Sequence, residues 1–152
     1  MKFMVDYKFK FKKERFENSW TLRPKIKVNI SYKGISKDVI CILDTGSDLN
    51  YIPLDMADYF CLSLSEETLT AQGAETEFSY KTSKIYVRLD HPHRTYRKLI
   101  EVMVPAKAAN HKDIIFGANF LKDFIVNLDY LKGTITLTVN QKGLQAKATK
   151  IR

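Results

Sequence analysis

Short runs in which apolar and polar residues alternate recur along this chain, and they constrain its fold more than any other feature. The first run spans residues 3–11, where Phe3, Val5, Tyr7, Phe9 and Phe11 are separated by residues that are mostly charged. A period of two is typical of a strand with one buried face. Further strands are predicted at 25–31, 38–43, 96–104, 113–116, 126–130 and 134–139, with a turn at Lys33-Gly34 between the first two and a long hairpin over 68–89. The chain is therefore predicted to be mainly β.

Two short segments break this period and predict brief helices. Residues 53–60 begin with a proline and place Leu54, Ala57 and Phe60 on one face, and residues 118–124 are the second candidate. Residues 38–43 form a nearly continuous apolar run, which is typical of a strand buried on both faces. Short strands joined by tight turns favour a closed or sandwich-like barrel with one or two short helices.

The length and the charge distribution predict one domain with basic ends. The 152 residues, 45% of them hydrophobic, suffice for one core, and no segment is apolar enough to span a membrane. Residues 1–27 hold nine Lys and Arg against three Asp and Glu, whereas 28–140 hold twelve against fourteen. We expect a basic strand or extension over 1–24, a folded domain over 25–140, and a basic tail or linker over 141–152.

The cysteines and histidines do not suggest a disulfide scaffold or a metal site. Cys41 and Cys61 are too few for such a scaffold, so we expect free thiols, core positions for both residues and a cytoplasmic setting. His91, His93 and His111 lack further ligands at metal-binding spacing. No phosphate-binding loop or dinucleotide fingerprint is present, and no cofactor is expected.

The segment Asp44-Thr45-Gly46-Ser47 carries the clearest chemical signal. It follows an apolar strand, so it delivers one carboxylate into a tight turn. Two carboxyl groups that lie close together share a proton, and such a pair activates water for peptide hydrolysis. Gly46 permits close backbone approach, the Thr45 hydroxyl can stiffen the loop, and Ser47 can bond the outer oxygen of Asp44. Alone, these residues more often form a simple turn.

A second element makes the signal more specific. The segment 114–121 (IIFGANFL) again joins an apolar strand to a glycine and a short helix, and its Gly117 lies seventy-three residues after Asp44. The segment 127–137 (NLDYLKGTITL) closes with a hairpin. With D-T-G-S, then I-P-x-x-x-A, then the long hairpin, this ordered set resembles the retropepsin family of aspartic peptidases. The resemblance covers residues 25–139.

The resemblance implies a role for each matching residue. Asp44 would be the catalytic aspartate, Thr45 would form interlocking hydrogen bonds across a dimer axis, and Gly46 would shape the loop. Residues around the hairpin tip would form a flap over the substrate, namely Gln72, Gly73 and Ala74. A strand beside the catalytic loop would contain Ile115, Phe116 and Gly117. The fold implied is the closed barrel of retropepsins.

The sequence departs from the family pattern at one pair of positions. Many viral members carry an arginine after the second glycine, where it pairs with an aspartate just past the catalytic loop. Here Ala118 occupies the arginine position, while Asp48 stands at the aspartate position. Asp48 must therefore find another partner, reach solvent or contact the substrate.

The chain has ten aspartates, and Asp44 alone precedes Thr-Gly or Ser-Gly. One carboxyl group cannot act as both acid and base, so we expect a homodimer that cleaves polypeptides. The strand at 3–11 is a candidate for the shared interface, although it could pack as an edge strand on its own chain. Two alternatives remain: a non-catalytic dimerisation or protein-binding module, and a nucleic-acid-associated domain of a larger polyprotein, which is less favoured.

Overall fold

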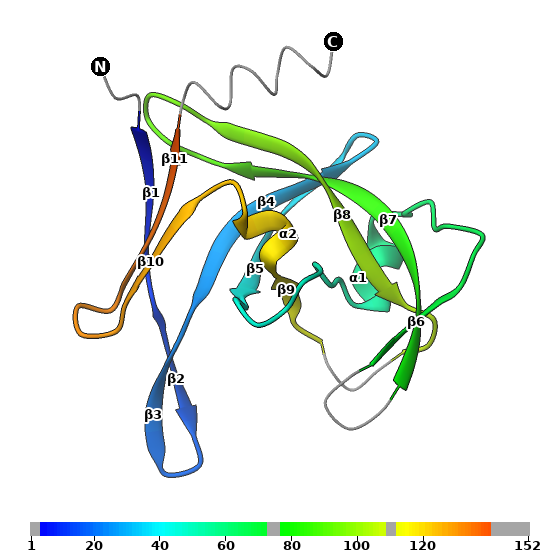
Figure 1. The fold of residues 1–152 in the computed structure, drawn as a ribbon, viewed down its shortest axis with the longest axis horizontal. Helices are drawn as coiled ribbons and strands as arrows, with labels where there is room; N and C mark the ends of the chain where they lie inside the picture. The colour runs from blue at the N-terminus through cyan, green and yellow to red at the C-terminus, as the bar shows by residue number, and fades with distance from the viewer. Residues whose placement is uncertain (1–3, 73–76, 109–111, 141–152) are drawn as a thin grey trace.

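The structure is a computed structural model that describes residues 4–72, 77–108 and 112–140. Strands dominate, and two short helices interrupt them (Figure 1). In chain order the elements are β1 (Met4–Lys10), β2 (Lys12–Phe16), β3 (Ser19–Arg23), β4 (Lys25–Tyr32), β5 (Ile35–Leu43), α1 (Leu54–Tyr59), β6 (Leu69–Gln72), β7 (Glu77–Leu89), β8 (Tyr96–Pro105), β9 (Ile114–Phe116), α2 (Ala118–Leu121), β10 (Ile125–Asp129) and β11 (Thr134–Asn140). The predicted mainly-β class is confirmed.

The described strands form three sheets. One has the order β1-β11-β10, a second consists of β2 and β3, and the largest has the order β6-β7-β4-β5-β9 with β8 paired to β7. In Figure 1 the β2–β3 hairpin extends away from the six-stranded sheet. Closure of the sheets into one barrel stays a prediction, as does the division of the chain at residues 24 and 140.

The β4–β5 hairpin positions the D-T-G-S segment. Tyr32 and Ile35 face each other at its end, and the two residues between them, Lys33 and Gly34, have φ angles of 44° and 85°. Positive φ at both positions is what a two-residue hairpin turn requires. This turn was predicted from Lys33-Gly34, and it brings residue 43 back beside residue 24.

The expectation that 38–43 is buried on both faces is wrong. In β5, Val39, Cys41 and Leu43 point into the core, whereas Ile40 is 45% exposed. The reason is that β5 pairs antiparallel with β4, and antiparallel sheets commonly leave one face in water. A continuous apolar run does not distinguish this arrangement from full burial.

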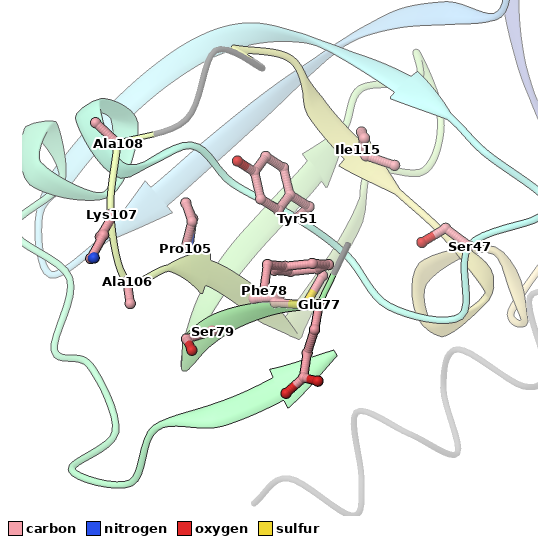
Figure 2. A pocket seen from close by; sticks show the side chains of 11 residues that line it. Ser47, Tyr51, Glu77, Phe78, Ser79, Pro105, Ala106, Lys107, Ala108 and Ile115 are labelled. Atoms are coloured by element: carbon pink, nitrogen blue, oxygen red, sulfur yellow. The ribbon is translucent and has the colours of Figure 1, made fainter. Parts of the chain in front are cut away.

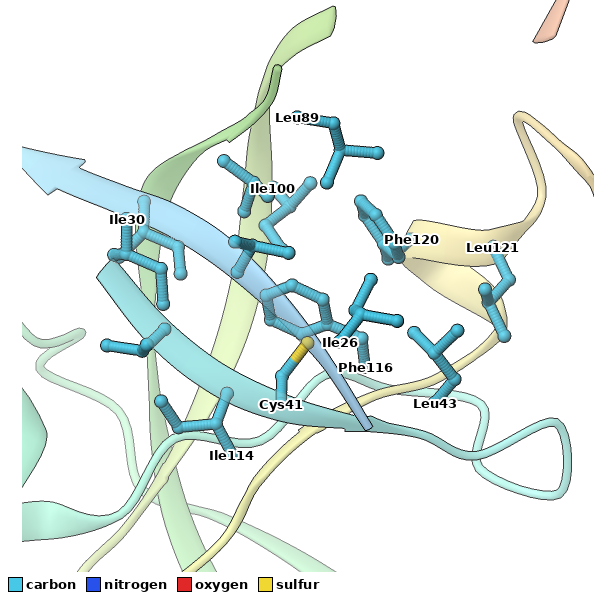
Figure 3. Packing of buried hydrophobic residues seen from close by; sticks show 14 of the residues in the cluster. Ile26, Ile30, Cys41, Leu43, Leu89, Ile100, Ile114, Phe116, Phe120 and Leu121 are labelled. Atoms are coloured by element: carbon cyan, nitrogen blue, oxygen red, sulfur yellow. The ribbon is translucent and has the colours of Figure 1, made fainter. Parts of the chain in front are cut away.

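A single large cluster of buried side chains joins most of the elements. Figure 3 shows Ile26 of β4, Cys41 and Leu43 of β5 and Phe116 of β9 packed beside Phe120 of α2. The Phe116 and Phe120 rings lie 4.8 Å apart. The Cys41 thiol is buried there, and burial raises its pKa, so it behaves as a small apolar side chain.

The N-terminal strand belongs to this core. β1 pairs antiparallel with β11 of the same chain, and Val5 faces Val139. Val5 and Tyr7 are buried in the large cluster. The structure therefore shows β1 packed as an edge strand on its own chain.

The β2–β3 hairpin was not predicted. Four of the five residues of β2 are charged, and no two apolar residues face each other across the hairpin, because Trp20 pairs with Arg15 and Leu22 with Lys13. The turn at its tip uses Glu17 at a φ of 54° rather than a glycine. The period of two does not mark it in β2, and its two-residue turn, Glu17-Asn18, lacks the glycine of the commonest hairpin turns.

The helices differ slightly from the predicted ranges. α1 buries Ala57, and the following Phe60 is also buried, as the shared face indicated. α2 ends at Leu121 instead of residue 124, because Lys122 caps it and a turn follows. Cys61 is free and exposed, with φ at 52°, so its expected place in a core element is wrong. Among the described residues, neither helix is long and apolar enough to cross a bilayer.

Two phenylalanines test this assignment of the core. Phe120→Ala should lower the free energy of unfolding by about 3 to 5 kcal/mol, because it leaves a cavity among buried rings. Phe16→Ala, at a side chain that is 58% exposed, should change it by less than about 0.5 kcal/mol. Urea unfolding at one protein concentration measures both. Equal losses for the two variants would contradict the packing described above.

Candidate active site

Asp44 lies where β5 ends beside β9. The two strands are parallel, with Leu43 opposite Phe116, and the Asp44 amide donates to the Phe116 carbonyl over 2.9 Å. The carboxylate side chain is half-buried at the surface of this junction. A buried strand pair therefore fixes the backbone that carries the carboxylate.

The D-T-G-S segment forms a tight turn that orients the carboxylate. The Ser47 amide donates to the Asp44 carbonyl over 3.2 Å, and the Gly46 amide donates to Asp44 Oδ1 over 2.9 Å. A Cβ on residue 46 would lie 3.3 Å from that same oxygen, which leaves little room for a side chain. Thr45 and Gly46 are exposed on the outside of the turn.

The Ser47 hydroxyl does not bond Asp44, contrary to the expectation from the sequence. It donates to the Leu49 carbonyl over 2.9 Å. Serine side chains readily bond backbone groups two residues further on, and such local bonds compete with longer-range ones. Here the bond stiffens the segment after the turn and leaves Oδ1 to the Gly46 amide.

Gly117 makes the closest backbone contact in the site. A Cβ at this position would lie 2.2 Å from the Ser47 carbonyl oxygen and 2.6 Å from that of Leu49. The next two residues bind the same segment. The Ala118 amide donates to the Ser47 carbonyl over 2.7 Å, and the Asn119 amide donates to the Asp48 carbonyl over 3.1 Å. Residue 117 has to be glycine for α2 to reach the loop.

Asn50 is a buried residue of this site that the sequence did not reveal. Its side chain is 1% exposed, and its Oδ1 accepts a hydrogen bond from the Gly117 amide over 3.1 Å. Its Nδ2 donates to the Glu101 carbonyl over 2.9 Å and to Asn119 Oδ1 over 3.0 Å. One buried amide thus joins the loop to β8, to α2 and to the glycine between β9 and α2.

The segment after Asn50 is also held on both sides. Tyr51 exchanges two backbone hydrogen bonds with Ile115, of 2.7 and 2.9 Å, and the Ile52 amide donates to the Met103 carbonyl over 3.0 Å. Burial raises the pKa of the Tyr51 hydroxyl, and the nearby Asp55 carboxylate adds to this. Tyr51 therefore stays neutral as a wall of the adjoining pocket.

A pocket of about 620 Å³ adjoins the loop (Figure 2). Ser47, Tyr51 and Ile115 line it on the loop side, and Phe78 and Met103 add further apolar surface. Asp44 itself is not among the lining residues, so the carboxylate lies beside the pocket. The pocket is mostly apolar, and it can take a large hydrophobic side chain.

The hairpin that was expected to form a flap lies over this pocket at its described end. β6 and β7 pair antiparallel, Gln72 faces Glu77, and Glu77 and Phe78 line the pocket. Gln72 is exposed. The expected tip residues Gly73 and Ala74 lie outside the described residues, so the flap stays a prediction.

Asp48 is exposed, which is one of the three outcomes expected when no arginine follows the second glycine. Its backbone carbonyl accepts the Asn119 amide, so the segment is tied to α2 by main-chain bonds. A contact between Asp48 and substrate stays a prediction.

In the H-P-H segment the His91 imidazole binds the backbone that follows it. His91 Nδ1 accepts hydrogen bonds from the amides of His93 and Arg94, over 3.0 and 3.2 Å. Within 4–72, 77–108 and 112–140, no group of three or more His, Cys, Asp or Glu is placed to hold a metal ion. His111 lies outside these residues.

Comparison with known proteins supports the fold. No protein-family profile and no curated protein sequence matches the chain. A crystal structure of a retropepsin-like aspartic protease from Rickettsia conorii is similar, with a TM-score of 0.56 and 13% identity, over 91% of this chain and 94% of that one. An EIAV protease bound to an inhibitor covers 66% of this chain and 86% of its own, with 15% identity and a TM-score of 0.44. The likeness to the Rickettsia structure shows that the fold of this chain is retropepsin-like.

The brace around Asn50 can be tested directly. Asn50→Ala should lower the free energy of unfolding by about 2 to 4 kcal/mol, because the Gly117 amide and the Glu101 carbonyl lose a buried partner. Asn127→Ala, on an exposed strand position, is the matched control and should cost less than about 0.5 kcal/mol. Urea unfolding measures both changes. A loss at residue 50 no larger than that at residue 127 would show that the amide does not brace the loop.

Proposed function

We propose that the protein is an aspartic endopeptidase in which Asp44 from each of two chains forms one catalytic pair. The observation that carries this proposal is the position of Asp44: a half-buried carboxylate, fixed by a strand junction and oriented by the Gly46 amide, beside an apolar pocket. The retropepsin-like fold is the one in which such a turn would serve this chemistry. Thr45 would stabilise the paired loops, and Gly46 would allow their close approach.

The reaction follows from a shared proton. The ionised carboxylate takes a proton from a water molecule, whose oxygen attacks the carbonyl carbon of the peptide, while the protonated carboxyl group gives its proton to the carbonyl oxygen. The carboxyl group that is now ionised then takes a hydroxyl proton from the tetrahedral diol, while the carboxyl group protonated by the water gives its proton to the amide nitrogen. The C–N bond breaks, and an acid and an amine are released. Two carboxyl groups a few ångström apart favour this state, because both cannot ionise at that distance.

The requirement for two chains follows from the composition of the site. Each chain supplies one D-T-G turn, at Asp44. A two-fold axis between two copies would place two such turns face to face with one symmetric interface. The exposed outer side of the turn, at Thr45 and Gly46, supports this because it offers backbone surface for a second copy.

The pocket supports a polypeptide substrate. Tyr51, Phe78 and Ile115 surround an apolar space next to the turn, where a side chain flanking the cleaved bond would be buried. An extended substrate could bond the backbone of the β6–β7 hairpin as an added strand does. Gln72, Gly73 and Ala74 would then cover it from the hairpin side, with Asp48 near one end.

Replacement of the carboxylate tests the chemistry. Asp44→Asn should lower the rate of cleavage of an unfolded protein by about 1,000-fold, because an amide neither takes up a proton from water nor shares one. Asp58→Asn removes the same charge from the exposed face of α1 and should retain the wild-type rate. Mass spectrometry of the cleavage products over time measures both rates.

Assays of the wild-type chain and of Asp44→Asn also separate the proposal from the alternative of a non-catalytic module. If the wild-type chain forms dimers yet cleaves no unfolded protein or peptide library, the fold serves as a non-catalytic module. If cleavage persists in Asp44→Asn, another group performs it and the proposal is wrong.

Dilution tests the need for two chains. The rate per chain should fall in proportion to protein concentration below the dimer dissociation constant, because a lone chain has half of the pair. An excess of Asp44→Asn chains added to wild-type protein should suppress cleavage, since mixed dimers carry one carboxylate, whereas an excess of Asp58→Asn chains should not. Constant activity per chain throughout the dilution series would contradict the shared site.

A further inference from the structure

The β2–β3 hairpin forms a sheet of its own, and the proposed peptidase site uses none of its residues. It extends from the body next to the β10–β11 sheet, at the lower left of Figure 1. A two-stranded hairpin is marginally stable on its own, so backbone hydrogen bonds alone do not explain this one and its side chains need examination. We call residues 12–23 the ribbon.

The register of the ribbon separates its side chains into two faces. Arg15 faces Trp20 and Lys13 faces Leu22 across the strands. Because successive side chains alternate between faces, these four residues share one face. Phe16 lies on the opposite face, near the tip.

The two aromatic rings of the ribbon are exposed. Trp20 is 61% exposed and Phe16 is 58% exposed, although both are large apolar side chains. The Lys13 ammonium group lies 5.2 Å from the centre of the Trp20 ring, which holds the cation above an exposed π surface. A stacking surface and a positive charge thus occupy the same face.

The ribbon carries an excess of positive charge that is not cancelled within it. It holds four Lys and Arg, at positions 12, 13, 15 and 23, against Glu14 and Glu17. Glu14 is already engaged, because its carboxylate pairs with Lys25 at the start of β4 over 2.6 Å. This pair lowers the pKa of Glu14, and Lys12 and Arg23 lower it further. The Trp20 face itself contains two cations and no acid.

We propose that the Trp20 face of the ribbon is a binding site for single-stranded nucleic acid, with Lys13 and Arg15 at the phosphates and a base stacked on the Trp20 ring. Aromatic rings interleaved with Lys and Arg are how proteins bind single strands without sequence preference. A single strand fits better than a duplex, because its bases are not already stacked. The site lies outside the proposed catalytic loop, so it stands whether or not the chain cleaves peptides.

Charge is the reason for choosing nucleic acid over the other occupants of such a surface. Residues 28–140, which would present the surface of a second copy, carry a net charge of −2 spread over 113 residues. A protein surface with so little net negative charge is a weak partner for a face with two adjacent cations and no acid. A polymer with one negative charge per unit and a flat ring per unit matches both features at once.

Intrinsic fluorescence offers a direct measurement, because Trp20 is the single tryptophan of the chain. Titration of the full chain with an oligothymidine of about 12 nucleotides should quench this fluorescence as bases stack on the ring. Inorganic polyphosphate should bind with little quenching, because it has charge but no rings. Quenching of equal size by both would show an electrostatic site without stacking and would overturn the proposal.

Variants distinguish the two parts of the site, with binding followed by anisotropy of a labelled oligothymidine. Trp20→Ala should weaken binding about tenfold and leave the salt dependence unchanged, while Trp20→Phe should restore most of the affinity. Lys13→Glu/Arg15→Glu should lower the slope of log affinity against log salt by about 1.4, or 0.7 for each lost phosphate contact, measured from about 50 to 200 mM salt.

The matched control reverses two exposed lysines on the body, Lys122→Glu/Lys132→Glu. It should leave affinity and slope within about twofold of wild type. An equal loss in this control would assign the binding to overall charge, and unchanged binding in the ribbon variants would assign it to another segment. If the ribbon variants instead dissociate a dimer without changing oligonucleotide binding, the ribbon is a protein interface. Each of these three results would overturn the proposal.

Discussion

The close contact between Gly117 and the loop that follows Asp44 is the constraint on which the site depends. Since no side chain fits between residue 117 and the carbonyls of Ser47 and Leu49, two segments far apart in the sequence lie directly against each other. The amide of Asn50 then uses its hydrogen-bonding groups on that contact and on β8. Main-chain geometry therefore fixes the position of Asp44. Its carboxylate accepts a hydrogen bond from the Gly46 amide and faces outward.

The sequence predicts those parts of this arrangement that depend on a short pattern of neighbouring residues. The turn at Lys33-Gly34 depends on residues that adopt positive φ, and the β4 and β5 strands show the period of two. The segments around Asp44 and Gly117 are recognisable because each joins an apolar strand to a small residue. Such patterns need no knowledge of the partner segment. They also fail where they are degenerate, since the run at 38–43 gave no sign that Ile40 would face water.

Asn50 and the β2–β3 hairpin show why the rest could not be predicted. Asn50 lies in an irregular segment, and the groups that satisfy it are 51 to 69 residues away, so no local pattern marks it. An asparagine between strands is usually interpreted as a turn residue. In the hairpin, charged side chains replace the apolar face that would identify a strand, because most of the ribbon faces water instead of the core.

The loop at Asp44 and the ribbon differ in the kind of ligand that each can recognise. The loop at Asp44 is held by main-chain hydrogen bonds and lies beside an apolar pocket, which under the proposed function would bury side chains of an extended polypeptide. The ribbon has its own ladder and is linked to the start of β4 through the Glu14–Lys25 pair, so it can present cations and rings without disturbing the loop. Since the basic residues concentrate outside the part of the chain that forms the loop and the pocket, a polyanion on the ribbon would not compete for the space next to Asp44. The two sites are therefore separable by substitution, and the loss of one does not predict the loss of the other.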